Sequence, residues 1–157
     1  MNDNIKKMIE NFLPYQIDYT ANFNKSFRRE FQSQCVSPEI GADEFAILRL
    51  LDIEADVSQT DIAKVLFKGK AHIGKILNDM ERNGYIKRVV DTKNNIMIKK
   101  NIMTEKALKQ LELGKVKSKI IEDKMKSEFS KEEELQFISY LKRFRKVLDS
   151  IVDVKLK

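Results

Sequence analysis

Few side chains in this sequence are suited to enzymatic or metal chemistry. Among 157 residues there is one histidine, His72, and one cysteine, Cys35, and the two are far apart in the chain. The four nitrogen or sulfur ligands of a zinc site are therefore lacking, and no glycine-rich phosphate loop is present. Carboxylates are plentiful, but lysines are interleaved with them on predicted helical faces, which is typical of solvated surface. We expect no enzymatic activity, no metal and no cofactor.

The composition indicates an ordinary, helix-rich globular protein. It is 42% hydrophobic and 34% charged, with only 5 Gly and 2 Pro, which excludes collagen-like and low-complexity classes. A single cysteine allows no internal disulfide. No apolar run approaches the ~20 residues of a membrane helix, and the first residues lack the basic and apolar regions of a signal peptide. We therefore expect a cytoplasmic protein without a membrane partner.

Positive charge is concentrated in the middle of the chain. Residues 58–103 contain 10 basic and 4 acidic residues, whereas residues 1–57 contain 6 basic and 10 acidic residues. A basic segment within an otherwise balanced chain is typical of a protein that binds a polyanion. The alternative is that these lysines only provide solubility.

The elements in this basic segment follow a recognisable order. Ser58, with Asp61 three residues later, is a good N-cap for a helix through Leu66. After a short turn containing Gly69, a second helix is predicted from about Lys70 to Asn83. Gly84 is its stop signal. Two helices joined by a glycine-containing turn of three or four residues predict a helix-turn-helix. The second helix has an apolar stripe formed by Ile73, Ile76, Leu77 and Met80.

A β-hairpin is predicted directly after the helix-turn-helix. Residues 85–90 and 96–103 are rich in β-branched and aromatic side chains, and the polar residues 91–95 separate them. A hairpin in this position is a wing. The central part of the chain therefore predicts a winged helix.

Long helices are expected on both sides of this core. Before it, Pro14 either starts a second N-terminal helix or kinks a continuous one. Aromatic residues then recur every four positions, which keeps them on one helical face: Tyr15, Tyr19, Phe23, Phe27 and Phe31. Such a stripe is core or interface, or else the wall of a ligand cavity. Residues 35–41 are predicted to form a connection.

After the hairpin, Thr104 starts a helix in which Gly114 could introduce a bend. Ser130 and Glu133 form a capping box for the last helix. We expect the fold to be mainly α with a small β-hairpin wing.

The order and spacing of these motifs resemble the MarR family of winged-helix transcription regulators. The most specific stretches are residues 58–66, residues 71–88, Asp91 and residues 103–107. In particular, Met80–Arg88 is similar to the family's pattern L-E-x-x-G-L-(I/V)-x-R. The resemblance implies a winged helix-turn-helix in residues 41–103 and a helical dimerisation region formed by residues 1–40 and 104–157. It also implies binding of double-stranded DNA.

The sequence departs from the family pattern at two places. The family wing usually has an arginine shortly after its Asp, but residues 92–95 contain none, and Lys93 does not replace an arginine in a narrow minor groove. Ala107 stands where the family often has glycine. The missing arginine motivates a second hypothesis, in which the chain is a winged-helix interaction module that binds nucleic acid or an acidic partner without sequence specificity.

If the second helix enters the major groove, the side chains opposite its apolar stripe face the bases. Lys75 could donate to guanine, Asn78 could pair with adenine, and Gly74 could allow close approach of the backbone, although it could also be a tolerated surface glycine. His72 is either a groove-facing donor or an incidental surface residue. The N–H groups near Ser58 and Gln59 offer an anion site, and lysines including Lys87 and Lys100 could contact phosphates. The full set of predicted DNA-binding residues is Ser58, Gln59, Lys68, Lys70, Ala71, His72, Gly74, Lys75, Asn78, Lys93, Asn95 and Lys99.

The flanking helices carry more apolar surface than one winged helix can cover, which favours a homodimer. A dimer would place two recognition helices about 34–36 Å apart on a pseudo-palindromic site. The alternative is that some apolar residues of the flanking helices pack within one protomer. The residues predicted at the dimer interface are Ile5, Ile9, Phe12, Leu141, Phe144, Leu148 and Ile151.

The resemblance also implies a repressor that a small aromatic or phenolic anion releases from DNA. Tyr15, Tyr19, Phe23 and Arg49 are the nearest candidates for binding it, because tyrosines combine an apolar wall with a polar end and Arg49 could pair with a carboxylate. Some family members sense oxidants through a cysteine. Glu30 and Glu39 near Cys35 do not favour a thiolate, so an inert thiol is the main expectation.

Overall fold

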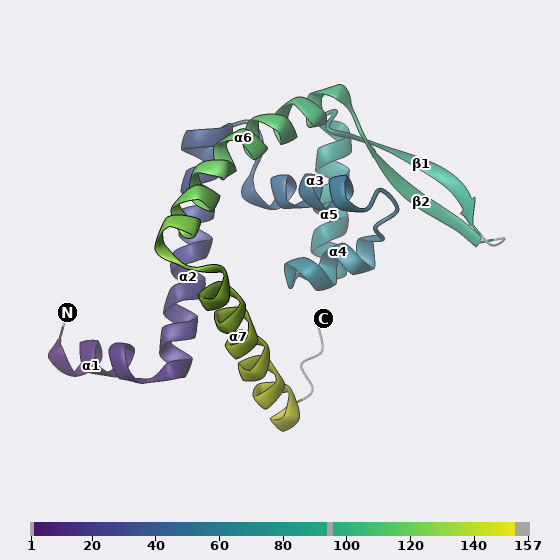
Figure 1. Cartoon of the computed structure of the whole chain (residues 1–157). Coiled ribbons are helices and arrows are strands. Elements are labelled where there is room, and N and C mark those ends of the chain that lie inside the picture. The colour runs from purple at the N-terminus through teal and green to yellow at the C-terminus, as the bar shows by residue number, and fades with distance from the viewer. Residues whose placement is uncertain (1, 94–95, 153–157) are drawn as a thin grey trace. The chain divides into compact units, whose positions relative to one another are not determined.

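The computed structural model describes residues 2–93 and 96–152, with the side chains of 91–99 left aside. Over these ranges it has seven α-helices, one π-helical segment and one antiparallel hairpin (Figure 1). The predicted fold class is therefore confirmed. The chain divides into two compact units, Met1–Asp43 and Glu44–Lys157. The predicted division into a dimerisation region and a DNA-binding domain stays a prediction.

The N-terminal unit is formed by two helices and a π-helical end. In α1 (Asp3–Asn11), the side chain of Asn2 accepts a hydrogen bond from the N–H of Asn4. Phe12 is extended, and Pro14 lies in the first turn of α2 (Leu13–Phe31), where a missing N–H costs nothing. Pro14 thus starts a separate helix, one of the two predicted alternatives. The π-helical segment Gln32–Val36 continues α2, so the helical conformation extends past Cys35, where a connection was predicted.

Most of the core lies in the C-terminal unit, with Val36 and Ile40 buried in the N-terminal unit. The core in the C-terminal unit is formed by α3 (Ala42–Ile53), α4 (Gln59–Leu66), α5 (Lys70–Arg82), the start of β1 and the first half of α6 (Glu105–Glu128). All four residues of the predicted apolar stripe on α5 are buried. The large side chains that are fully buried are Ile47, Leu48, Ile62, Ile73, Leu77, Met80, Ile86 and Leu111.

Gly114 lets α6 approach α3 closely. A Cβ atom at Gly114 would lie 2.0 Å from Cζ of Phe45. That distance is impossible for real atoms, so any larger residue would force the Phe45 ring out of its place. The glycine predicted as a possible bend in the helix is therefore explained by side-chain packing.

The hairpin consists of β1 (Ile86–Lys93) and β2 (Ile96–Met103), paired in register from Ile86 with Met103 to Lys93 with Ile96. The first strand is longer than predicted, because Asp91, Thr92 and Lys93 also belong to it. Figure 1 shows the hairpin projecting from the junction with α5 and α6. This arrangement of helix-turn-helix and hairpin is the predicted winged helix.

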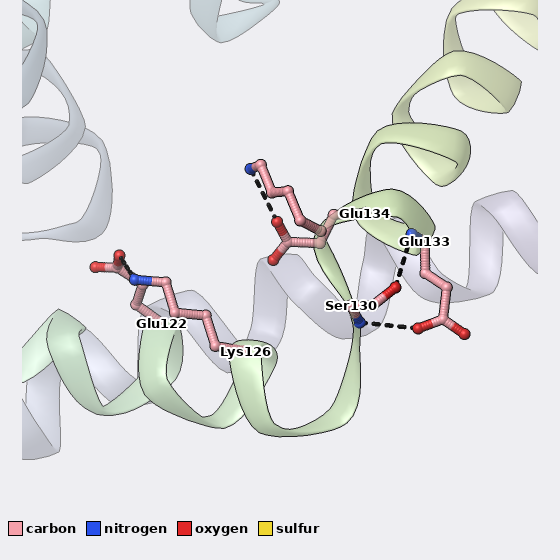
Figure 2. A network of polar contacts seen from close by, with 6 residues as sticks. Glu122, Lys126, Ser130, Glu133 and Glu134 are labelled. Carbon is pink, nitrogen blue, oxygen red and sulfur yellow. Dashed lines mark hydrogen bonds and ion pairs between the residues drawn. The ribbon is translucent and has the colours of Figure 1, made fainter.

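Local capping defines α6 and the last helix, α7 (Lys131–Ile151). Thr104 accepts a hydrogen bond from the N–H of Ala107. Ser130 and Glu133 form the predicted capping box, in which Ser130 Oγ accepts from the Glu133 N–H (3.2 Å) and Glu133 Oε2 accepts from the Ser130 N–H (2.8 Å) (Figure 2). One turn before this junction, the hydrogen bond from Lys126 lowers the pKa of Glu122 and raises the pKa of Lys126.

Three helices contain no buried residue over the described part of the chain: α1, α2 and α7. Among the helices that the structure describes, none is long and apolar enough to cross a lipid bilayer.

Candidate nucleic-acid interface

The helix-turn-helix begins at a well-formed cap. Ser58 Oγ accepts a hydrogen bond from the N–H of Asp61 (3.1 Å) and donates one to Asp61 Oδ2 (2.6 Å). This confirms Ser58 as the N-cap of α4. The Asp61 carboxylate places a negative charge beside the predicted anion site near Ser58 and Gln59, and Lys64 partly offsets it at 3.9 Å. The charge of Asp61 disfavours a phosphate at this helix end.

Helix α5, the second helix of the helix-turn-helix, presents one line of side chains opposite its buried stripe. With 100° per residue, the positions farthest from that stripe are Ala71, Lys75, Asn78 and Arg82. All four are exposed. The first three were predicted from the sequence and Arg82 was not, although the same helical spacing is enough to find it. His72 is also exposed and lies at the edge of this face.

The structure changes the interpretation of Gly74 and Gln59. The side chain of Gln59 donates a hydrogen bond to the carbonyl of Lys70 (2.8 Å), which ties the first turn of α4 to the first turn of α5. A Cβ atom at Gly74 would lie 2.8 Å from Gln59 Nε2. Gly74 therefore makes room for Gln59. This packing explains the glycine without a contact between the helix backbone and DNA.

Asn78 is held by the wing strand. Arg88 Nη1 donates a hydrogen bond to Asn78 Oδ1, and the Arg88 N–H donates to Glu81 Oε1 (3.0 Å). Because a guanidinium has only donors, Asn78 must turn its oxygen toward Arg88. Nε of Arg88 is buried and has no partner among the described residues. This role of Arg88 was not predicted from the sequence, because it depends on a contact between two elements.

Arg82 is paired with a neighbour on the same helix. Its Nη2 lies 2.7 Å from Asp79 Oδ1, and the Arg82 side chain is largely exposed. An exposed pair of this kind contributes little to stability and can reorganise toward a phosphate or a base.

The root of the wing is fixed to the end of α5. Thr104 Oγ1 donates to the carbonyl of Gly84 (2.7 Å), and the Thr104 N–H donates to the carbonyl of Tyr85 (3.0 Å). Lys106 Nζ lies 4.3 Å from the centre of the buried Tyr85 ring. Gly84 has φ +75°, which confirms it as the stop of α5. The angle between recognition helix and hairpin is thus set by several contacts at one corner.

Two ion pairs connect α3 and its following turn to later elements. Lys100 Nζ lies 3.0 Å from Asp56 Oδ1, so this predicted phosphate contact is already engaged with a carboxylate. Lys115 Nζ lies 3.0 Å from Asp52 Oδ2. Hydrogen bonds from Lys115 to Glu112, and then to Asp52, raise the pKa of the Lys115 ammonium.

The remaining predicted phosphate contacts differ in their surroundings. Lys70, Lys75 and Lys87 are exposed and form no ion pair with any residue that the structure describes. Lys68 is half-buried. Asn95 lies outside the described residues, as do the side chains of Lys93 and Lys99.

The predicted ligand residues come from both units. Tyr15, Tyr19 and Phe23 are exposed on α2, with Phe23 at 65%, and Arg49 is exposed on α3. The aromatic stripe is thus not buried core. Within the described ranges, no group of three or more His, Cys, Asp or Glu side chains could hold a metal ion.

The seven predicted interface residues are exposed or half-buried, and none is fully buried. Ile5, Phe12, Leu148 and Ile151 are exposed, whereas Ile9, Leu141 and Phe144 are half-buried.

No family model and no curated protein matches the chain. Solved structures do. The structure of S. aureus MepR in complex with DNA has a TM-score of 0.73 and 22% sequence identity, covering 88% of this chain and 98% of that chain. A MarR/EmrR-family transcriptional regulator from Acinetobacter sp. ADP1 has a TM-score of 0.74 and 23% identity, covering 90% of this chain and 98% of that chain.

A third similar structure is the PcaV transcriptional regulator from Streptomyces coelicolor with its natural ligand. Its TM-score is 0.68 at 14% identity, and the match covers 88% of this chain and 94% of that chain. Together with the geometry of α4, α5 and the hairpin, these likenesses confirm the predicted resemblance at the level of the fold. This chain has the winged-helix fold of the MarR/EmrR-family transcriptional regulators.

Proposed function

We propose that this chain is a MarR-type transcription regulator that binds a specific, pseudo-palindromic DNA site as a homodimer. The observation that carries the proposal is the outward line of Ala71, Lys75, Asn78 and Arg82 on α5, next to a hairpin anchored at the same corner. In a helix-turn-helix, such a line lies in the major groove. The DNA complex of MepR supports this assignment.

Charge supports a polyanionic partner, and DNA is such a partner. Residues 58–103 carry a net charge of +6 from 10 basic and 4 acidic residues, and Lys70, Lys75 and Lys87 are exposed. If each half of a dimer contacts three to five phosphates, affinity falls ~10³–10⁵-fold between 50 and 200 mM salt. Lys75 is the best candidate for reading guanine O6 or N7.

The contact with Arg88 redefines the expected role of Asn78. Arg88 occupies one acceptor position of the Asn78 amide oxygen, so the amide group is oriented before DNA arrives. Its NH₂ group is then the part offered to the groove, and an acceptor such as a purine N7 suits it.

The exposed apolar faces of α1, α2 and α7 support the homodimer. These helices have no buried residue in the described protomer. Exposed apolar residues nevertheless recur three positions apart, as Ile5 and Met8 in α1 and as Leu148 and Ile151 in α7. A second copy would cover them and would supply the second recognition helix that an inverted repeat requires.

A repressor that an aromatic anion releases from DNA is the finer part of the proposal. The exposed aromatic stripe of Tyr15, Tyr19 and Phe23 supports it, and PcaV was solved with its natural ligand. Such a ligand acts only if it binds better to one spacing of the two recognition helices than to the other.

A test is selection from sheared genomic DNA of the source organism at about physiological salt, followed by sequencing. We expect a few enriched sites that contain an inverted repeat. Uniform retention would instead favour the second candidate, an interaction module without sequence specificity. The absence of arginine from residues 92–95 is the observation that favours this candidate. No retention would contradict the sequence-specific regulator and would leave an acidic protein as the partner of the second candidate.

A further inference from the structure

Helices α4 and α5 end in the same backbone motif with very different residues. At the end of α5, the N–H of Tyr85 donates to the carbonyl of Met80 and Gly84 has φ +75°. At the end of α4, the N–H of Lys68 donates to the carbonyl of Ala63 and Phe67 has φ +52°. This left-handed position is usually occupied by glycine, because a Cβ atom is unfavourable there. A bulky residue with positive φ is a genuine outlier.

The fold does not compensate for this strain by burying the ring. Phe67 is 69% exposed, although it directly follows α4, in which Ile62 and Ala63 are buried. Among the residues that the structure describes, Phe67 is the one residue other than glycine with a positive φ. An exposed aromatic ring in a strained turn is the kind of outlier that occurs at functional sites.

The surroundings of Phe67 indicate which partner would cover the ring. Phe67 lies in the turn of the helix-turn-helix, two residues before Gly69, the N-cap of recognition helix α5. Lys64, Lys68 and Lys70 flank it in the sequence. Three lysines this close to the ring in the sequence disfavour an apolar protein surface as the partner and match a nucleic-acid backbone, with Lys64 also 3.9 Å from Asp61. The apolar group that a DNA duplex exposes in its major groove is the C5-methyl group of thymine.

We propose that Phe67 is a DNA-contacting residue that packs against the methyl group of a thymine at the edge of each half-site. The inference rests on the proposed function and adds an apolar reader to the polar line on α5. Removing the ring should then relieve strain in the protein and weaken the complex. A merely structural side chain would not produce these two opposite effects.

The test compares the wild type with Phe67→Gly and Phe67→Asn, because both glycine and asparagine tolerate the left-handed conformation. Val65→Ala, which shortens another exposed apolar side chain of α4, is the matched control. We expect Phe67→Gly to raise the Tm by about 2–4 °C. On the site selected from genomic DNA, we expect both Phe67 variants to bind about tenfold or more weakly, measured by fluorescence anisotropy. Val65→Ala should bind like the wild type.

Replacing each thymine of the site by uracil, one position at a time, removes single methyl groups. For the wild type, we expect one position per half-site to lose about fourfold in affinity, as expected for one buried methyl group, and Phe67→Gly should show no loss there. Equal binding by Phe67→Gly and wild type, or a uracil effect that persists in the variant, would overturn the inference. Specific binding by the wild type in the same titration would leave the proposed function standing.

Discussion

The winged helix buries its apolar side chains within one chain, whereas the flanking helices leave theirs exposed. In the winged helix, Ile73, Leu77 and Met80 of α5 are fully buried against neighbouring elements of the same unit. In α1, α2 and α7 the apolar residues are as regularly spaced, but none is buried. The first region has what it needs to fold from one chain. The second leaves its apolar residues uncovered in one chain, and we propose that a second copy covers them.

The largest effect is expected from a charge on the uncovered face of α7. Leu148 is 47% exposed in the protomer, and Leu148→Glu would place a carboxylate in the proposed dimer interface. We expect a monomer in analytical ultracentrifugation and a ~10²–10⁴-fold loss of affinity for a complete inverted repeat, because one half-site no longer assists the other. Ser150→Glu adds the same charge on another face of α7 and should stay dimeric. A dimeric Leu148→Glu would contradict the proposed interface.

Shortening a side chain in the core of the winged helix should lower the free energy of unfolding. Leu77 is 0% exposed, so Leu77→Ala leaves a cavity and should lower the free energy of unfolding by about 2–5 kcal/mol. The exposed Val65, changed to Ala, should alter it by no more than about 0.5 kcal/mol. Urea denaturation measures both. Similar values for the two variants would mean that α5 does not pack as described.

A variant of Lys75 shows whether this side chain recognises a base or only attracts phosphates. Lys75→Ala should weaken binding to the selected site by about 1–3 kcal/mol and binding to mixed-sequence DNA much less. Lys119→Ala, an exposed lysine on α6, serves as the charge-matched control and should show a small loss on both. If Lys75→Ala weakens binding to both DNAs equally, the lysine is only a phosphate contact.

A smaller effect is expected where the wing contacts the recognition helix. Arg88→Met removes the donor to Asn78 Oδ1 while keeping most of the apolar length. In a double-mutant cycle with Asn78→Ala, we expect a coupling of about 1 kcal/mol in specific binding. A base preference that changes at the same base pair in both single variants would support a positioning role for Arg88. Additive effects would show that the two side chains act independently.

The smallest effect concerns the capping box between α6 and α7. Ser130→Ala removes the acceptor for the Glu133 N–H and should cost about 1 kcal/mol in the free energy of unfolding. Ser130→Thr keeps a hydroxyl and should cost less. Because Ser130 is remote in sequence from α5, DNA affinity per folded dimer should be unchanged. Thermal denaturation and anisotropy together check both statements.

Local signals in the sequence predicted most of the fold. Ser58, Thr104 and Ser130 cap helices, and Gly84 ends α5, because each acts through its own backbone neighbours. The buried stripe of α5 followed from helical spacing in the same way. These features need no knowledge of distant residues.

Features that depend on contacts between elements were not predicted. Gly74 accommodates Gln59 of another helix, Gly114 accommodates Phe45, and Asn78 is oriented by Arg88 of the wing strand. The left-handed conformation of Phe67 was also missed, since no sequence rule places a phenylalanine there. Propensity and periodicity describe one element at a time, and these roles arise only when two elements meet.

We propose that the outward face of α5 recognises a specific base sequence. The most direct measurement is the affinity of the wild-type dimer for its selected site and for a scrambled site of the same composition, at one fixed salt concentration. We expect the affinity for the selected site to be at least ~10³-fold higher, with a substantial part of this ratio lost in Lys75→Ala. Equal affinity for the two DNAs would show instead that the winged helix binds polyanions without recognising their sequence.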